Sequence, residues 1–289
     1  MKKLVFCHGL GFTKSLMMPL ILSIESFYGS DRIHNSHFSA ALQNSLSLAD
    51  LQRKDDAENN QQTLNSDSKA AKPKNKSAAK QGKTSSSKVN STEDSFIFND
   101  SLDNQIEIIN LDMGYFGDKI TASKNLDGAV AIGHGLGFNK LLAMNVKWCG
   151  IVGISTLLQF VYDEESRRKI ENLESSLNIN SELALKSLIA RLSNGEVAIN
   201  LPYPNADINL IKADAEYLKN TDSRQALQKN PLPTLFLHGG KDNWFNAAAA
   251  EQQFKDYNIL INADASHILG FLQAAWCRDN IIKFIDSLS

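Results

Sequence analysis

The chain has 289 residues, of which 43% are hydrophobic and 21% are charged, so it can form one α/β domain with an insertion. The formal net charge of −2 excludes a global field that would attract nucleic acid or a membrane surface. The three cysteines predict no disulfide framework and fit a cytoplasmic location. The apolar run near the N-terminus is too short for a signal peptide, and no run reaches the ~18 residues of a transmembrane helix.

Predicted strands and helices alternate along the chain. Short apolar runs predict strands at 4–7, 106–109, 129–132, 149–154, 234–237 and 259–261. Helices are expected at 15–30, 138–144, 156–195 and 270–287. This alternation indicates a mostly parallel, doubly wound α/β sheet, in which chemistry is found at the carboxyl ends of the strands.

Composition divides the chain into five predicted segments. Residues 46–95 are polar and poor in apolar side chains, which predicts a disordered, low-complexity insertion. Its lysines have no aromatic residues beside them for stacking on bases, so we expect a solvated spacer and no nucleic-acid partner. The core is expected to begin in 1–45, continue in 96–154 and end in 229–289, with a helical cap at 155–228.

A glycine-rich segment, Gly133-His134-Gly135-Leu136-Gly137, follows one predicted strand and opens a predicted helix. Its spacing is that of the G-x-S-x-G turn, in which the flanking glycines let a helix pass close to a strand. A plain strand-to-helix turn is one alternative. A dinucleotide-binding turn is another, but the last glycine of that pattern is replaced by Phe138.

Three further motifs also follow predicted strands. His8-Gly9-Leu10-Gly11 comes after the first strand, and Asp242 follows the strand at 234–237 within His238-Gly-Gly-Lys-Asp. His267 comes after the last strand. Taken singly, they have structural alternatives: a simple turn, a helix-capping aspartate and a buried histidine. Their order along the chain, with the glycine-rich turn before Asp242 and His267, is the more specific signal.

Together these motifs resemble those of the α/β-hydrolases, over nearly the whole chain except the insertion. The resemblance implies an α/β-hydrolase fold in which Asp242 orients His267, the general base. It also implies an oxyanion hole formed by the backbone N–H groups of Leu10 and Leu136, and substrate contacts from His134 and Leu10. The segment from Asp112 to Gly117 matches the family's D-x-x-G-x-G pattern loosely, and the usual leading hairpin is missing or reduced.

Gly135 stands where this family carries its nucleophilic serine, and it has no hydroxyl group to form an acyl-enzyme. Two explanations remain open. Either glycine is native to a relative that does not hydrolyse esters, or a serine has been replaced deliberately in this chain. We favour replacement, because Asp242 and His267 retain the expected order; a native glycine codon in the natural gene would end that interpretation.

The cap exit resembles a particular group of esterases. Tyr217, Asp222, Arg224 and Leu227, followed by Pro231, are similar to the corresponding segment of pimeloyl-[acyl-carrier protein] methyl ester esterases of biotin synthesis. That resemblance implies a serine carboxylesterase that hydrolyses the methyl ester of a pimeloyl chain held on an acyl carrier protein. General short-acyl esterases or lipases, and ligand-binding relatives without turnover, are the alternatives.

An acidic carrier protein would suit a basic cap surface. Arg167, Arg168 and Arg191 are the candidate docking residues, although we favour the alternative of a solvated helix face with Glu164, Glu165 and Glu171 as internal partners. No His/Cys cluster has the spacing of metal ligands. We therefore expect no metal and no cofactor, and an acyl substrate as the main partner.

Overall fold

The computed structural model describes residues 2–28, 95–97, 106–122, 125–229 and 231–288. These residues belong to one compact unit, Met1–Ser30 with Glu93–Ser289. Of the predicted insertion at 46–95, only the last position is among the described residues. Residues 29–45, at the end of the predicted 1–45 segment, also lie outside them.

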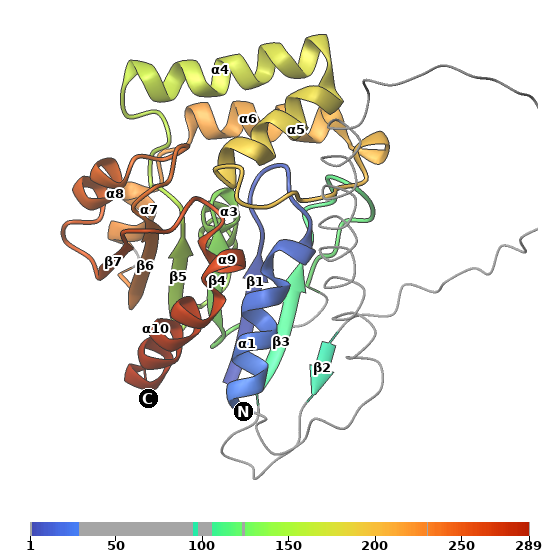
Figure 1. Ribbon diagram of the computed structural model, residues 1–289. Helices are drawn as coiled ribbons and strands as arrows, with labels where there is room; N and C mark the ends of the chain where they lie inside the picture. Colours follow the sequence, from blue (N-terminus) through green and yellow to red (C-terminus); the bar gives the residue numbers. More distant parts are fainter. Residues whose placement is uncertain (1, 29–94, 98–105, 123–124, 230, 289) are drawn as a thin grey trace, which may run out of the picture. The chain divides into compact units, whose positions relative to one another are not determined.

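A seven-stranded sheet forms the centre of the described part, with the order β2-β3-β1-β4-β5-β6-β7 (Figure 1). The strands are β1 (Lys2–Cys7), β2 (Ser95–Ile97), β3 (Ile106–Leu111), β4 (Val130–His134), β5 (Gly150–Ile154), β6 (Thr234–Gly239) and β7 (Ile259–Asn262). All neighbouring pairs are parallel except β2 with β3, which is antiparallel. The predicted α/β class with a mostly parallel sheet is confirmed.

Alternation along the first strand explains why both faces of the sheet are covered. Leu4 and Phe6 join a hydrophobic cluster on one face, whereas Val5 and Cys7 join a second cluster on the other. All four are buried, and every residue of β4 and β5 is buried as well. Continuous apolar strands of this kind require helices on both faces, which is the arrangement of a doubly wound sheet.

Helices cover the two faces as that argument requires (Figure 1). The helices of one face are α1 (Met18–Tyr28), which follows the short helix η1 (Lys14–Met17), α9 (Leu269–Leu272) and α10 (Ala274–Ser287). The helices α3 (Leu136–Leu142) and α8 (Ala247–Gln253) contact β4 and β6. The predicted helix at 270–287 is divided, because the backbone at Gln273 leaves helical geometry (φ −118°, ψ 40°).

The segment between β5 and β6 forms a helical cap over the carboxyl ends of the strands (Figure 1). It contains α4 (Glu164–Ile179), α5 (Ser181–Leu192), η2 (Tyr203–Asn205), α6 (Ile208–Asn220) and α7 (Arg224–Lys229). The single helical stretch predicted at 156–195 is two helices. Asn180 ends α4 and caps the start of α5 by accepting a hydrogen bond from the Leu183 N–H (3.0 Å), so the chain reverses there.

The three-residue strand β2 was not expected from the sequence. It lies at the end of the polar segment, and its backbone pairs antiparallel with β3 at the edge of the sheet. Among the described helices, none combines the length and apolar character needed to cross a bilayer.

Candidate active site

Gly135 occupies a sharp turn between β4 and α3. Its backbone has a positive φ (50°, ψ −124°), a conformation that glycine adopts without strain and other residues adopt at a cost. The Gly135 N–H donates to the Ile154 carbonyl (2.9 Å), and the Thr156 hydroxyl donates to the Gly135 carbonyl (2.8 Å). The turn is therefore held in a defined geometry by the end of the neighbouring strand.

The glycines on either side of this turn allow close packing of the backbone. A Cβ atom on Gly133 would overlap the backbone of Phe138, and one on Gly137 would overlap the carbonyl oxygens of Cys7 and His8. Helix α3 consequently starts directly against the ends of β4 and β1. This is the physical role that the G-x-S-x-G spacing assigns to its flanking glycines.

His267 and Asp242 lie together beside this turn, on the loops that follow β7 and β6. His267 Nδ1 is 2.8 Å from Asp242 Oδ2, and both side chains are almost completely buried. Asp242 Oδ1 accepts hydrogen bonds from the backbone N–H groups of Trp244 (2.8 Å) and Phe245 (2.9 Å). Burial alone would raise the pKa of Asp242, but the contact with His267 and these hydrogen bonds lower it, so the carboxylate is ionised and orients the imidazole.

The other imidazole nitrogen of His267 faces residue 135. An ideal Cβ atom on Gly135 would lie 3.7 Å from His267 Nε2, in ordinary van der Waals contact and without a clash. No hydrogen bond within the described residues involves this nitrogen. A serine hydroxyl at position 135 would therefore fit and would lie within reach of His267 Nε2, a nitrogen that has no other partner within the described residues.

Two backbone donors flank the same spot. The N–H groups of Leu10 and Leu136 make no hydrogen bond within the described residues. A small pocket of about 20 Å³ adjoins them, and its lining consists of Leu10, Gly135, Leu136, Leu188, Leu192, Leu218, Trp244, Phe245 and His267. The pocket thus combines an apolar wall, one imidazole nitrogen and two N–H groups that could bind a developing oxyanion.

His134, expected to contact the substrate, is not among the residues that line this pocket. Its ring is buried, and Nε2 lies 3.1 Å from the His267 carbonyl oxygen. The ring also makes edge contacts with Phe12 and with the His267 ring. Burial, followed by the nearby His267, lowers the pKa of His134 to about 3, so this imidazole is neutral and supports the loop that carries His267.

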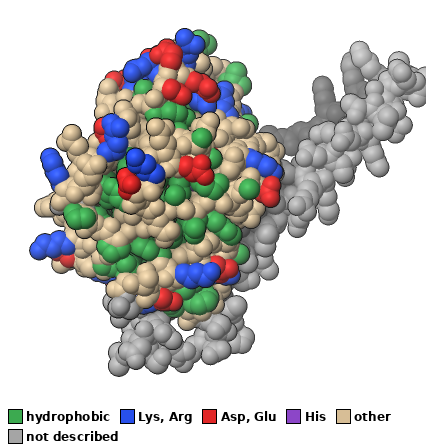
Figure 2. Space-filling view, turned by 90° about the vertical axis from the view of Figure 1, so that its left-hand side faces the viewer, with side chains coloured by type: hydrophobic (Ala, Val, Ile, Leu, Met, Phe, Trp, Pro, Cys, Tyr) green, Lys and Arg blue, Asp and Glu red, His purple; other side chains and the backbone are tan. Residues whose placement is uncertain are grey.

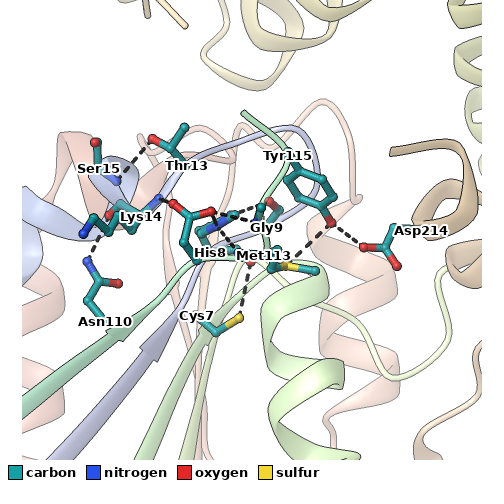
Figure 3. A network of polar contacts seen from close by, with 12 residues as sticks. Cys7, His8, Gly9, Thr13, Lys14, Ser15, Asn110, Met113, Tyr115 and Asp214 are labelled. Atoms are coloured by element: carbon teal, nitrogen blue, oxygen red, sulfur yellow. Dashed lines mark hydrogen bonds and ion pairs between the residues drawn. The ribbon is translucent and has the colours of Figure 1, made fainter. Parts of the chain in front are cut away.

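The His8-Gly9 turn is fixed by a polar network (Figure 3). His8 Nδ1 is 3.0 Å from the Gly9 carbonyl, and Nε2 lies 3.1 Å from Asp112 Oδ1 and 3.0 Å from the Met113 nitrogen. Asp112 also accepts a hydrogen bond from the Lys14 N–H (3.0 Å). Burial would raise the pKa of Asp112, but the His8 contact and these backbone donors lower it to about 2. The network holds the loop that carries the Leu10 N–H.

A second buried contact ties the cap to the core, and it was not expected from the sequence. The Tyr115 hydroxyl donates to Asp214 on α6 (2.6 Å), as Figure 3 shows. Lys140 on α3 bonds the other Asp214 oxygen (2.6 Å) and lies 4.1 Å above the Tyr217 ring. Since α3 starts at the turn that contains Gly135, this contact positions the cap relative to the site.

The candidate docking arginines lie on the cap. Arg167 and Arg168 are exposed on α4, where Arg168 pairs with Glu164 one turn away (3.2 Å). Figure 2, which faces the left-hand side of Figure 1, shows acidic and basic side chains mixed at the cap end of the molecule. Arg191, on α5, lines a separate groove of about 230 Å³ between α4, α5 and Trp244.

This groove, which Lys169 also lines, leads toward the small pocket. Leu188 and Trp244 line both hollows, so they stand between the cap surface and the His267 imidazole. Within the described residues, no group of three or more His, Cys, Asp or Glu side chains could hold a metal ion.

Solved structures with a similar fold include hydrolases and esterases. A hydrolase from Oleispira antarctica is 11% identical, with 99% of this chain and 91% of that chain covered and a TM-score of 0.61. An esterase from Exiguobacterium antarcticum is 11% identical (99% and 92% covered, TM-score 0.58), and carboxylesterase CesB from Bacillus subtilis is 12% identical (98% and 83%, TM-score 0.53).

No protein-family description and no curated protein sequence matches the chain. At identities this low, the structural likeness establishes the fold and not the activity. The chain has the α/β-hydrolase fold, which confirms the fold predicted from the glycine-rich turn and the motifs that follow the strands.

Proposed function

We propose that this chain is a carboxylic ester hydrolase of the serine esterase type in which glycine occupies the nucleophile position, 135. One observation carries the proposal. His267 is bonded to Asp242 through Nδ1 (2.8 Å), and its Nε2 lies 3.7 Å from where the Cβ atom of residue 135 would be. A base oriented by a carboxylate and aimed at that position is the arrangement that activates a serine hydroxyl.

With serine at position 135, the reaction would follow directly from this geometry. The hydroxyl oxygen attacks the ester carbonyl carbon while His267 takes its proton, and the Leu10 and Leu136 N–H groups bind the oxyanion. His267 then protonates the departing alcohol, which leaves an acyl-enzyme. Water, deprotonated by His267, attacks that acyl group and releases the carboxylic acid and the free serine.

The apolar character of the site supports an acyl substrate, because five of the nine residues that line the pocket are leucines. The pocket of about 20 Å³ is too small for the acyl chain itself, which would extend into the groove of about 230 Å³ that shares Leu188 and Trp244 with it. As the particular substrate we propose the methyl ester of a pimeloyl chain on an acyl carrier protein, in the cytoplasm. The groove that Lys169 and Arg191 line would suit the anionic arm of such a carrier, and it shares Leu188 and Trp244 with the pocket. The mixed charges around Arg168 give less support to docking on α4.

The absence of a hydroxyl at Gly135 favours one alternative, a ligand-binding relative without turnover. A deliberate replacement of serine would instead leave the rest of the site in working order. The two explanations predict different results when serine is restored at position 135. Only a former enzyme should regain ester hydrolysis, because the rest of its site is in working order.

The test compares Gly135→Ser with Gly135→Ala on p-nitrophenyl esters. Both variants place a Cβ atom in the same backbone conformation, and only the first supplies an oxygen nucleophile. We expect the serine variant to hydrolyse the ester about 10⁶-fold faster than the alanine variant, the size of effect seen when a serine nucleophile is lost. Equal rates would contradict the proposal and favour the binding protein.

The substrate is tested separately in the Gly135→Ser protein. Rescue of a biotin-requiring strain that lacks its pimeloyl ester hydrolase would support the pimeloyl substrate, and no rescue by an active esterase would point to a general short-acyl esterase.

Charge reversal at Arg191, compared with reversal at Arg167 and Arg168, then identifies the cap surface that a carrier protein contacts. Unchanged turnover of a carrier-bound ester would exclude the reversed surface.

A further inference from the structure

The absence of a side chain at Gly135 leaves room at the centre of the site. The atoms nearest to where a Cβ would be are His267 Nε2 at 3.7 Å, Gly9 Cα at 3.8 Å and the Ser155 carbonyl oxygen at 3.8 Å. A serine hydroxyl would extend from that Cβ toward Nε2, so with glycine the place of the hydroxyl oxygen is open. The question is what else can occupy it.

His267 Nε2 borders this place, and the N–H groups of Leu10 and Leu136 belong to residues that line the same pocket; none of these three groups has a hydrogen-bond partner within the described residues. The imidazole side chain is only 4% exposed. The pocket that these residues line has a volume of about 20 Å³, and a water molecule needs a polar cavity of roughly 10 to 15 Å³ with two to four partners. Size and polarity therefore both fit one water molecule.

We propose that a water molecule bound to His267 Nε2, in the place that a serine oxygen would occupy, acts as the nucleophile in the Gly135 chain, while the N–H groups of Leu10 and Leu136 bind the carbonyl oxygen of the ester. This inference rests on the proposed ester-hydrolase function and extends it. The chain would hydrolyse activated esters directly, through one tetrahedral intermediate and without an acyl-enzyme.

The step balances with water and ester alone. His267 Nε2 removes a proton from water as the water oxygen forms a bond to the carbonyl carbon, and the carbonyl oxygen becomes an oxyanion held by Leu10 and Leu136. The imidazolium then donates that proton to the alkoxy oxygen as the C–O bond breaks. The products are the carboxylic acid and the alcohol, and His267 returns to its neutral form.

Glycine is necessary for this route, and that requirement supplies a matched control. In Gly135→Ala the Cβ atom would lie 3.7 Å from His267 Nε2. A water molecule bonded to Nε2 at about 2.8 Å, in the place of a serine oxygen, would be about one covalent bond length from that Cβ and is therefore excluded. Alanine thus removes the water site without adding a nucleophile, and leaves His267 and Asp242 unchanged.

The experiment measures p-nitrophenyl acetate hydrolysis by the Gly135 chain, Gly135→Ala, Gly135→Ser and His267→Gln. All proteins are first treated with a fluorophosphonate, which inactivates serine esterases, including any that contaminate the preparation. The Gly135 chain should remain at least 100-fold faster than His267→Gln, the lower end of what general-base catalysis contributes. Gly135→Ala should fall to the His267→Gln rate, and Gly135→Ser should lose its activity to the reagent.

Mass spectrometry during turnover provides a second readout. The Gly135 chain should show no covalent acyl adduct and no burst of p-nitrophenol, whereas untreated Gly135→Ser should show both. Thermal melts of Gly135→Ala and Gly135→Ser, which carry the same backbone strain, establish that a slow variant is folded.

Each outcome bears on one proposal or on both. If the Gly135 chain is no faster than His267→Gln while untreated Gly135→Ser is active, the water route is overturned and the ester-hydrolase function stands. Retention of the activity in Gly135→Ala also overturns the water route. If untreated Gly135→Ser is inactive as well, both proposals are overturned.

Discussion

Two histidines at the carboxyl edge of the sheet are each paired with a carboxylate, and they differ in one respect. His8 has contacts at both nitrogens, with Gly9 at Nδ1 and with Asp112 and Met113 at Nε2. His267 is bonded to Asp242 through Nδ1, and its Nε2 is left facing the pocket. The unbonded nitrogen, and not the pairing with a carboxylate, therefore distinguishes a histidine available for chemistry from one that fixes a loop.

The largest expected effect comes from replacing the two histidines in the Gly135→Ser protein. His267→Gln should lower kcat by about 10⁶, because the base is removed. His8→Gln should instead reduce the free energy of unfolding by about 1–3 kcal/mol, because its buried partners lose their hydrogen bonds. Kinetics and thermal melts on both variants measure this; equal losses of kcat would contradict the distinction.

Asp242 and Asp112, the carboxylates paired with the two histidines, should differ in the same way: loss of the first should affect turnover, and loss of the second should affect stability. In the Gly135→Ser protein, Asp242→Asn should lower kcat by about 10⁴, since the imidazole loses the partner that orients it. Asp112→Asn should cost about 2 kcal/mol of stability at pH 7, from a pKa lowered from 3.8 to about 2.

The pH dependence follows from the direction of that shift. A carboxylate with a depressed pKa stabilises the fold fully above its unfolded pKa, and the contribution is lost as the pH falls through the folded value. The difference in stability between the parent and Asp112→Asn should therefore be constant from pH 5 to 7 and shrink below about pH 4. Denaturant melts from pH 7 to below pH 4 measure this difference, and a difference that stayed constant below pH 4 would argue against ionisation of Asp112 as its cause.

His134 is a third buried histidine near the site, and it is held in its neutral form. Its pKa is about 3 when folded, against 6.5 ordinarily, so folding disfavours the protonated form and stability falls as the pH drops below about 6.5. Between pH 7 and 5, His134→Gln should lose about 2 kcal/mol less stability than the parent. Urea melts at both pH values test this, and parallel losses in the two proteins would contradict it.

The smallest expected effect concerns the contact between core and cap. Tyr115→Phe removes the hydroxyl that bonds Asp214 and should cost about 1.5 kcal/mol. Tyr203→Phe is a matched control, because the side chain of Tyr203 is partly exposed and, within the described residues, its hydroxyl donates one hydrogen bond, to the Ile199 carbonyl (3.1 Å). Thermal melts should show a larger loss of stability for Tyr115→Phe than for Tyr203→Phe. The reverse order would contradict a stabilising role for the Tyr115–Asp214 hydrogen bond.

The strands other than β2 were predictable because they are short apolar runs. β4 and β5 are buried on both faces, so the run itself is the signal. The edge strand β2 was missed because three residues acquire strand geometry only by pairing with β3. The division between α9 and α10 at Gln273 was missed because hydrophobic periodicity does not register a local change of backbone dihedrals.

For the site, the sequence indicated Gly135, Asp242 and His267 as separate turns after strands, and their distances came only from the structure. Thr156, whose hydroxyl bonds the Gly135 carbonyl, could have been suspected from its place just after β5, but its partner depends on how the strands align. The burial of His134 beneath the His267 loop is likewise a tertiary property that local sequence does not contain.

The role of residue 135 as the nucleophile position is tested by the mass of the Gly135→Ser protein after treatment with a fluorophosphonate. We expect one covalent phosphonyl group, on the serine introduced at position 135, and none at that position in Gly135→Ala or in Gly135→Ser carrying His267→Gln. A folded Gly135→Ser protein that gains no such mass would contradict the claim that His267, Asp242 and the turn at residue 135 form the nucleophile site of an esterase.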